Sequence, residues 1–565
     1  MKTKTLNIVI IAAVAVVAFV LGLLIMVLPS PPADLKGFSA EKAYSYLEKI
    51  AEKPHSVFDK EAHDEVEQYL KTTLESMGHT VEIHNWTPAQ HGLSDNITPD
   101  KILDYDKPVE YDITNLAVKI QGKRDNGILI MAHYDSRGHA SRTGEIPGSY
   151  GAADDGYGVA VMLEIVRIYA NVPAESLENS IYLCFTDAEE TGLYGSQLEM
   201  QLDYIDNVNF VINIEARGVK GPAYMFETSK NNSKVIELYK NADMPFSYSL
   251  ATAVYSVMPN FTDFTSALDM GKQGINFAVL DNLYYYHTPA DNISSVNKSS
   301  LQHYGSQIMP VIAEYVSDAK YGEANYFDAD SDSVFFNILP TVMAVYSQTA
   351  AIIFVVLCVL ACGAGIFWAF KKGKLRPKKA LMALGVVALA LVASAVLGLA
   401  VSYLVALIGG VPWKLTYVRV PLSEIPFALS YAIVLGLIIW LCIKKFTKDG
   451  QSKFEFFAAG IVVNALLALL TTFFLPGASF LFLWPALIGS VSLIVNALFD
   501  NYAASHVMLS LNIVIMLLFA VPLLYSFFLA LSIGGLAVLN LLLVIMLAVV
   551  LPSVFIQLDL KRKSI

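Results

Sequence analysis

The sequence predicts an α/β domain, with a mixed, mostly parallel sheet flanked by helices, joined to an all-α polytopic membrane domain. Apolar or alternating runs recur between residues 80 and 280 with helical patterns between them, which is the order expected of a sheet covered on both faces. From about residue 340 the chain is almost continuously apolar. Because 55% of the 565 residues are hydrophobic, the chain is too apolar for an ordinary soluble protein.

The first predicted element is a membrane helix. Residues 6–28 carry no charge, and this run of 23 positions is long enough to span a bilayer. Lys2 and Lys4 precede it, and no small-residue cleavage site follows before the proline-rich residues 29–32. A removed signal peptide would have a shorter apolar core, so residues 1–30 are predicted to be an uncleaved signal-anchor helix.

Residues 31–335 are predicted to form the α/β domain. Amphipathic patterns predict helices over 39–52 and 60–77, and Gly78 is placed to end the second. The clearest later helix covers 159–169. The predicted strands are 80–84, 115–120, 127–132, 180–186, 209–214 and 275–280.

Residues 336–565 are predicted to be a polytopic membrane domain with about seven helices. The apolar stretches lie near 345–370, 380–408, 425–443, 455–474, 478–498, 507–529 and 532–556. Few charges lie inside these spans, so no ion pathway is indicated and anchoring is the expected role.

The charges predict the orientation of these spans. Residues 336–565 hold 15 Lys and Arg against 5 Asp and Glu, and 13 of the basic residues fall in clusters at 371–379, 444–453 and 561–563. With a cytoplasmic N-terminus and eight spans in all, every cluster lies on the cytoplasmic side, as the positive-inside rule requires. The C-terminus is then cytoplasmic and residues 31–335 are extracytoplasmic. We expect a plasma membrane, because no organelle signal is evident.

The net charge of −11 must come from residues 31–335, since the rest of the chain is basic. This acidic domain contains no basic patch or P-loop motif. The net negative charge of this domain argues against a nucleic-acid partner.

Candidate metal ligands lie where predicted strands end. His133, Glu189 and Glu215 each follow an apolar run, and open α/β sheets build their sites at the carboxyl ends of strands. Imidazoles together with carboxylates suit zinc, and a spare carboxylate can act as a base. The complete set of candidates is His133, Asp154, Glu189, Glu190, Glu215 and His287.

Two local patterns refine this set. Asp135 lies two residues after His133, where its carboxylate can orient the imidazole. Of the adjacent Glu189 and Glu190, one can bind metal while the other acts as general base, although two solvated glutamates at a helix start fit that pair equally well. The remaining histidines, including His63 and His303, are expected to be ordinary core or surface residues, and His139 lies in a loop between two candidate ligands.

Four segments match a known family in its own order: HYDS, GAADDGYG, DAEETGLYGS and YHTPAD. By these motifs, residues 40–315 resemble metallopeptidase family twenty-eight, which includes co-catalytic zinc aminopeptidases and the glutamate carboxypeptidase and transferrin-receptor ectodomains. The layout also resembles the vacuolar and endoplasmic-reticulum membrane members, which carry a polytopic region after the peptidase domain. The resemblance implies a fold of the zinc exopeptidase type.

The resemblance also implies a role for each site residue. Two zinc ions are expected, one bound by His133 and Glu190, the other by Glu215 and His287, with Asp154 bridging both. Gly158 selects Asp154 over Asp155 as the bridge, and the peptide bond after the bridge is often cis in relatives. Glu189 would be the general base, Asp135 would orient His133, and Tyr286 would donate to the oxyanion. Many relatives have Asp where Glu215 stands.

These expectations favour a membrane-anchored di-zinc exopeptidase, an aminopeptidase before other types, that acts on peptides outside the cytoplasm. A carboxypeptidase or a glutaminyl-cyclase-like activity at the same site is the enzymatic alternative, and a cyclase-like enzyme would need one zinc. A non-catalytic membrane scaffold or transporter is disfavoured, because all five ligand positions and the base are present. The peptide substrate and the lipid bilayer are the expected partners, and the sequence indicates no oligomeric state.

Overall fold

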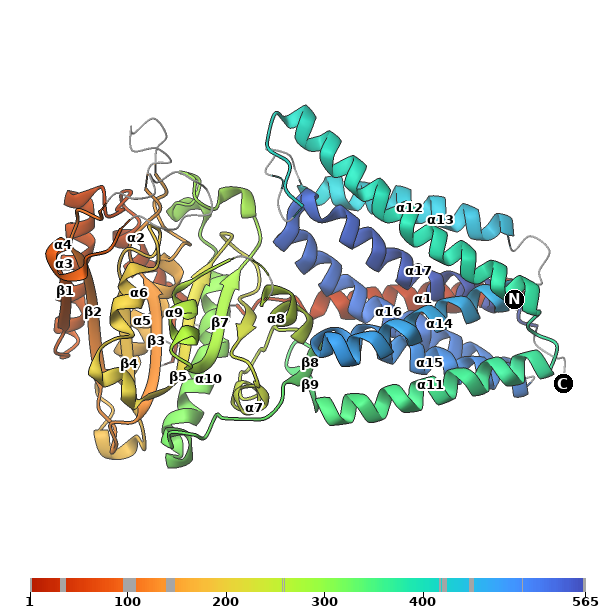
Figure 1. Cartoon of the computed structure of the whole chain (residues 1–565), viewed down its shortest axis with the longest axis horizontal. Coiled ribbons are helices and arrows are strands. Elements are labelled where there is room, and N and C mark those ends of the chain that lie inside the picture. Colours follow the sequence, from red (N-terminus) through yellow and green to blue (C-terminus); the bar gives the residue numbers. More distant parts are fainter. Residues whose placement is uncertain are drawn as a thin grey trace. The chain divides into compact units, whose positions relative to one another are not determined.

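The computed structural model describes residues 3–30, 37–94, 108–138, 148–256, 258, 260–415, 418, 424–446, 452–499 and 501–561. Contacts within the chain divide it into two units (Figure 1). The sheet unit comprises Val27–Ser333 and Pro340–Met343. The helical unit comprises Met1–Met26, Val334–Leu339 and Ala344–Ile565.

A seven-stranded mixed sheet forms the centre of the sheet unit, in the order β1-β2-β4-β3-β5-β7-β6. The neighbours β4–β3, β3–β5 and β5–β7 are parallel, and the pairs β1–β2, β2–β4 and β6–β7 are antiparallel. The predicted mixed sheet is therefore confirmed, although only half of its strand pairings are parallel. The strands are β1 Glu82–Trp86, β2 Ile113–Ile120, β3 Gly127–His133, β4 Ser180–Thr186, β5 Val208–Ala216, β6 Tyr224–Thr228 and β7 Gln273–Val279.

The central strands form where the sequence is apolar without alternation. Every residue of β3 and β4 is buried. Such runs are typical of parallel strands that are covered on both faces. By contrast, β1 lies at the edge of the sheet and is largely exposed or half-buried.

Helices cover both faces of this sheet. Leu129 and Met131 of β3 pack in one cluster with Phe264 of α9 (Asp263–Asp269). Ala132 faces α5 (Gly156–Tyr169), where it lies so close to Gly158 that the helix has no room for a Cβ there. Since successive strand side chains point to opposite faces, α9 and α5 lie on opposite faces. The odd-numbered His133 shares the α9 face.

The remaining helices of the sheet unit are short or amphipathic. Ser39 caps α2 by accepting the N–H of Lys42 at 3.3 Å. Gly78 follows α3 with a φ of +91°, a left-handed value that favours glycine, and the predicted helix end is confirmed. These helices are α2 Ala40–Ile50, α3 Lys60–Ser76, α4 Pro88–His91, α6 Tyr194–Glu199, α7 Ser233–Tyr239, α8 Ser249–Tyr255 and α10 Lys298–Ser317.

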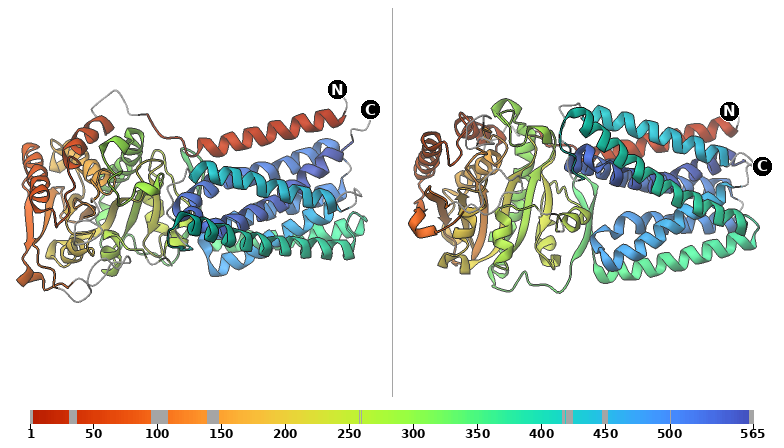
Figure 2. Two further views of the ribbon diagram at one scale, coloured as in Figure 1. Left: turned by 90° about the horizontal axis from the view of Figure 1, so that it is seen from above. Right: turned by 45° about the horizontal axis from the view of Figure 1, so that its top comes forward.

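Long apolar helices make up the helical unit and run side by side (Figure 2). They are α1 Thr3–Leu24, α11 Gln348–Lys371, α12 Pro377–Gly409, α13 Glu424–Phe446, α14 Lys453–Phe474, α15 Ser479–Leu498, α16 Tyr502–Leu531 and α17 Leu536–Asp559. By length and composition, six stretches of the described chain are able to cross a membrane. That count treats Tyr502–Asp559, which contains α16 and α17, as one stretch, and it omits α13, whose apolar part is the shorter Phe427–Leu441.

A polar cluster ties the first helix to the last two. Asn7 of α1 donates from Nδ2 to the carbonyl oxygens of Gln557 (2.8 Å) and Leu560 (3.0 Å). The hydroxyl of Tyr502, on α16, donates to Asn7 Oδ1 at 2.6 Å. The start of α1 therefore lies beside the end of α17.

A hairpin that the sequence pattern did not predict precedes the first helix after the sheet unit. Its strands are β8 Ser333–Leu339 and β9 Val342–Ser347. The expected boundary between residues 335 and 336 falls inside β8, and α11 begins at Gln348, three residues after the predicted start of that span.

Candidate metal centre

Two of the candidate ligands sit side by side because their strands are neighbours. In the parallel pair β3–β5, Met131 is in register with Asn213. His133 and Glu215 lie two residues further along these strands, at the carboxyl edge of the sheet, and both are buried. The sheet thus brings an imidazole and a carboxylate from distant parts of the sequence to one edge.

Side chains from three loops complete two groups of three ligands around Asp154. In the first group, His133 Nε2 lies 3.5 Å from Asp154 Oδ1 and 3.8 Å from Glu215 Oε2. In the second group, His287 Nε2 lies 3.2 Å from Asp154 Oδ2 and 3.1 Å from Glu190 Oε1. Within each group the potential ligand atoms all lie within 4.8 Å of one another. Asp154 is shared, with one oxygen directed to each group.

This grouping corrects the one that the resemblance implied. His133 shares its group with Glu215, not with Glu190, and His287 shares its group with Glu190. The reason is the strand order: β5, which carries Glu215, is a direct neighbour of β3. Glu190 comes from the loop after β4, on the other side of β3, and His287 reaches it from the loop after β7.

Each outer carboxylate has one oxygen held by a neighbouring side chain. Arg137 donates from Nη1 to Glu190 Oε2 (3.2 Å) and to the Glu190 carbonyl oxygen (2.6 Å). Asn213 donates from Nδ2 to Glu215 Oε1 at 3.3 Å. The other oxygen of each carboxylate faces its histidine, so each of the two residues offers one oxygen to its group.

The atoms that converge on the centre lack hydrogen-bond partners. His133 donates from Nδ1 to the carbonyl oxygen of Asp135 at 2.9 Å, which leaves the lone pair on Nε2. Among the described residues, four buried atoms here make no hydrogen bond: Nε2 of His133 and of His287, Asp154 Oδ2 and Glu190 Oε1. A buried polar atom without a partner costs about 1–3 kcal/mol, and one cation in each ligand group would together satisfy all four. Two imidazoles with three carboxylates are a donor set that fits zinc.

Asp154 and its neighbour Asp155 have separate roles. Asp155 caps α5 by accepting the N–H of Gly158 at 3.1 Å, and a Cβ at Gly158 would collide with its carboxylate. Asp154 instead faces the two imidazoles. The peptide bond between the two residues is cis, as the resemblance implied.

A family comparison matches this part of the chain. The model for peptidase family M28 matches residues 115–312. This segment is an M28 domain. It contains every candidate ligand, the adjacent Glu189 and Tyr286.

Among curated proteins, a vacuolar membrane protease of Clavispora lusitaniae is 28% identical over 280 residues, which cover 49% of this chain and 26% of that protein. Endoplasmic reticulum metallopeptidase 1 of Mus musculus is 30% identical over 273 residues, 47% of this chain and 29% of that protein. The matched region therefore spans less than a third of either relative. Among solved structures, a Zn-dependent exopeptidase from Parabacteroides distasonis is 20% identical over 49% of this chain and 98% of that chain, with a TM-score of 0.37.

In the M28 domain, the carboxylate of Asp135 contacts the loop after β4 as well as His133. Its carboxylate lies 3.3 Å from His133 Nδ1 and also accepts the backbone N–H of Glu189 (3.0 Å) and of Glu190 (3.2 Å). Glu190 is buried, whereas Glu189 is partly exposed. Loss of hydration, with the charges of Glu215 and Glu190 nearby, raises the pKa of Glu189 well above its usual range.

Tyr286 lies against one of the candidate ligands. Its ring stacks on that of His287, with centroids 3.6 Å apart and planes inclined by 23°. Burial, with the charges of Asp154 and Glu190 nearby, raises the pKa of Tyr286 well above its ordinary value. The phenol therefore stays protonated and able to donate.

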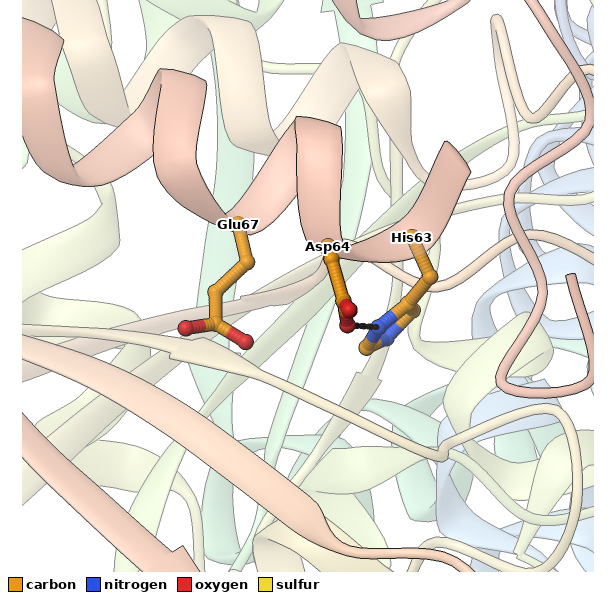
Figure 3. Close-up of side chains that lie close together, drawn as sticks. All are labelled: His63, Asp64 and Glu67. Atoms are coloured by element: carbon orange, nitrogen blue, oxygen red, sulfur yellow. Dashed lines mark ion pairs between the residues drawn. The ribbon is translucent and has the colours of Figure 1, made fainter. Parts of the chain in front are cut away.

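A third cluster of ligand-type residues, His63, Asp64 and Glu67, lies on α3 (Figure 3). Its imidazole is already engaged, because His63 Nε2 lies 2.8 Å from Asp187 Oδ1. The other oxygen of Asp187 accepts the N–H of Thr114 at 2.9 Å. Burial alone would lower the pKa of His63, but the charge of Asp187 and the hydrogen bond to it raise this pKa to about 9. We assign His63 to the support of the loop that carries Glu189 and Glu190.

The sequence predicts an ordinary core or surface position for His63 and indicates no role for Arg137. Nothing in the spacing of either residue indicates its partner, since Asp187 and Glu190 lie more than fifty positions away. His139, which the sequence places in the loop between two candidate ligands, lies outside the described residues.

Proposed function

We propose that the chain is a membrane-anchored di-zinc exopeptidase that acts as an aminopeptidase on peptides outside the cytoplasm. The observation that carries this proposal is that the two carboxylate oxygens of Asp154 face different groups of three ligands, one oxygen to each group. Two positions with three protein ligands each leave room for water or substrate at each ion, as catalytic zinc sites require.

The proposed ligands are His133, Glu215 and Asp154 for one zinc, and Glu190, His287 and Asp154 for the other. Bound zinc supplies a Lewis acid for the scissile carbonyl and lowers the pKa of a water at the site. Glu189 accepts the proton of the attacking water and passes it to the leaving amine. The Tyr286 hydroxyl donates a hydrogen bond to the oxyanion that forms at the carbonyl.

The charge around the centre supports an aminopeptidase over a carboxypeptidase. Beyond the three carboxylate ligands and Glu189, the buried carboxylates Asp155, Asp263 and Asp291 lie close by, and each interacts electrostatically with a ligand. Together these seven carboxylates outnumber the four positive charges of two zinc ions, and the remaining negative charge attracts the α-ammonium group of a peptide and repels its α-carboxylate. Two ligand groups also support a peptidase over a cyclase-like enzyme with one zinc.

We place the M28 domain outside the cytoplasm and both chain ends inside, in a plasma membrane. If each of the eight long helices among the described residues crosses the membrane once, both ends of the chain lie on one side, and the contact of Asn7 with Leu560 supports this arrangement. Lys453, which begins α14, pairs with Asp559 at the end of α17, so a basic cluster lies at that same end. The expected partners are the peptide substrate and the bilayer.

Blocked peptides test this proposal. Purified full-length protein in detergent should shorten carboxyl-blocked peptides from the amino end and leave amino-blocked peptides intact, as read by mass spectrometry. A chelator should abolish the activity, and zinc should restore it. Cleavage of only the amino-blocked peptides would indicate a carboxypeptidase, and a cyclised amino terminus would indicate the cyclase-like alternative. No product from any peptide would contradict the enzymatic proposal.

A further inference from the structure

The turn after His287 carries a buried carboxylate that the proposed mechanism does not use. Asp291 is 1% exposed and makes three contacts with the loop that carries Asp154. Its Oδ1 accepts the N–H of Ala153 at 2.7 Å, and its Oδ2 accepts the N–H of Asp154 and the hydroxyl of Ser149, both at 3.2 Å. No cation pairs with this carboxylate among the ion pairs of the described residues, so its partners are these donors.

The segment from His287 to Asp291 is short and internally bonded. The N–H of Asp291 donates to the carbonyl oxygen of Thr288 at 3.0 Å, and the N–H of Ala290 donates to the Thr288 hydroxyl at 3.2 Å. One end of this segment therefore holds the backbone of Asp154, through Asp291. The other end places the His287 imidazole 3.2 Å from the Asp154 carboxylate.

The two ligand groups depend on this turn to different degrees. His133 and Glu215 stand on the neighbouring strands β3 and β5, whose register is fixed by the sheet. Glu190 and His287 both come from loops, so the sheet does not set their separation. The Asp291 side chain connects the His287 loop to two successive backbone N–H groups, those of Ala153 and Asp154.

We propose that Asp291 is a positioning residue that builds the Glu190–His287 metal position by holding Asp154 against His287. The proposal rests on the proposed two-zinc function. Loss of the carboxylate releases the His287 loop from Asp154, so the second zinc binds more weakly while the affinity for the zinc at His133 and Glu215 is kept. An asparagine at this position keeps the size of the side chain but has one acceptor oxygen, and its NH2 group accepts no hydrogen bond, so the N–H of either Ala153 or Asp154 loses its acceptor.

The test measures zinc binding to the full-length protein in detergent over a range of buffered free zinc. The wild type should bind two zinc ions. Asp291→Asn should bind one zinc with unchanged affinity and the other about 10- to 100-fold more weakly, which is the usual effect of removing a partner that orients a ligand. Its turnover should fall at low zinc and recover as free zinc is raised, a rescue that a general loss of structure would not show.

Two further variants make the result decisive. Asp318→Asn removes an equal charge from a partly exposed carboxylate, whose contacts are with Lys320, and should keep both zinc ions. Ser149→Ala removes one of the three contacts of Asp291 and should weaken the second zinc alone; it decides the question if Asp291→Asn does not fold. Wild-type affinity for both ions in the two site variants, or equal loss of both ions, would overturn the proposal. A wild type that binds fewer than two zinc ions would instead refute the two-zinc function.

Discussion

The carboxylate of Asp135 accepts the backbone N–H of Glu189 at 3.0 Å, so the residue beside one proposed ligand also holds the proposed general base. The same carboxylate accepts the N–H of Glu190, with its second oxygen. One side chain thereby links the strand end at His133 to the loop that carries both glutamates.

Asp135→Asn should therefore lower turnover while both zinc ions remain. The asparagine has a single acceptor oxygen for two N–H donors, so one glutamate loses its backbone anchor. We expect a fall of about 10- to 100-fold in kcat, measured by peptide hydrolysis at saturating zinc. Asp125→Asn, at an exposed carboxylate paired with Lys119, is the matched control and should be neutral. Wild-type turnover in Asp135→Asn would show that Asp135 does not position the two glutamates for catalysis.

The two adjacent glutamates should respond differently to the same substitution. Glu189→Gln should keep the fold and both zinc ions but lose about a hundred- to ten-thousand-fold in kcat, because glutamine cannot accept the proton of the water. Glu190→Gln should weaken zinc binding instead, because a neutral amide is a poorer ligand than a carboxylate. Zinc content and turnover measured side by side check both outcomes. The opposite pattern would exchange the two roles.

The pair of His63 and Asp187 predicts a pH dependence of stability. The pKa of His63 is about 9 in the folded protein, above the ordinary value of 6.5, so folding favours the protonated form. This contribution is complete below about pH 6.5 and is lost as the pH rises through 9, and it amounts to about 3 kcal/mol by the size of the shift. The Tm difference between wild type and His63→Asn should accordingly shrink from pH 6 to pH 9.5. A difference that stays constant over this range would show that the charge of His63 does not stabilise the fold.

The proposed topology has a direct test. A reporter inserted at Asp328 should be extracytoplasmic, and one inserted at Lys374 or fused to the C-terminus should be cytoplasmic. An extracytoplasmic C-terminus would mean that one of the eight helices does not cross the membrane.

Much of the fold could be predicted because burial leaves a direct pattern in the sequence. The strands β3, β4 and β5 are apolar runs. His133 ends β3, Glu190 lies in the loop after β4, and Glu215 lies near the end of β5, so both the strands and the ligand positions can be recognised. The hairpin β8–β9 could not be recognised, because its apolar residues merge with the membrane helix that follows. The edge strand β6 was also missed: it has five residues, and its register with β7 shifts between Met225 and Glu227.

The grouping of the ligands could not come from spacing along the chain. It depends on β5 lying next to β3, a neighbour relation that the periodicity of each strand does not contain. The supporting roles of Arg137, His63 and Asp291 could not be predicted for a similar reason, since each residue contacts a loop that is distant in sequence.

Zinc content of paired variants tests the central claim, which is that two zinc ions share Asp154 with His133 and Glu215 on one side and Glu190 and His287 on the other. The variant that combines Glu190→Ala with His287→Ala removes two ligands from one position and should still bind one zinc. The variant that combines Glu215→Ala with His287→Ala removes one ligand from each position and should bind neither ion tightly. If the first variant lost both ions while the second kept one, the grouping and the account built on it would be contradicted.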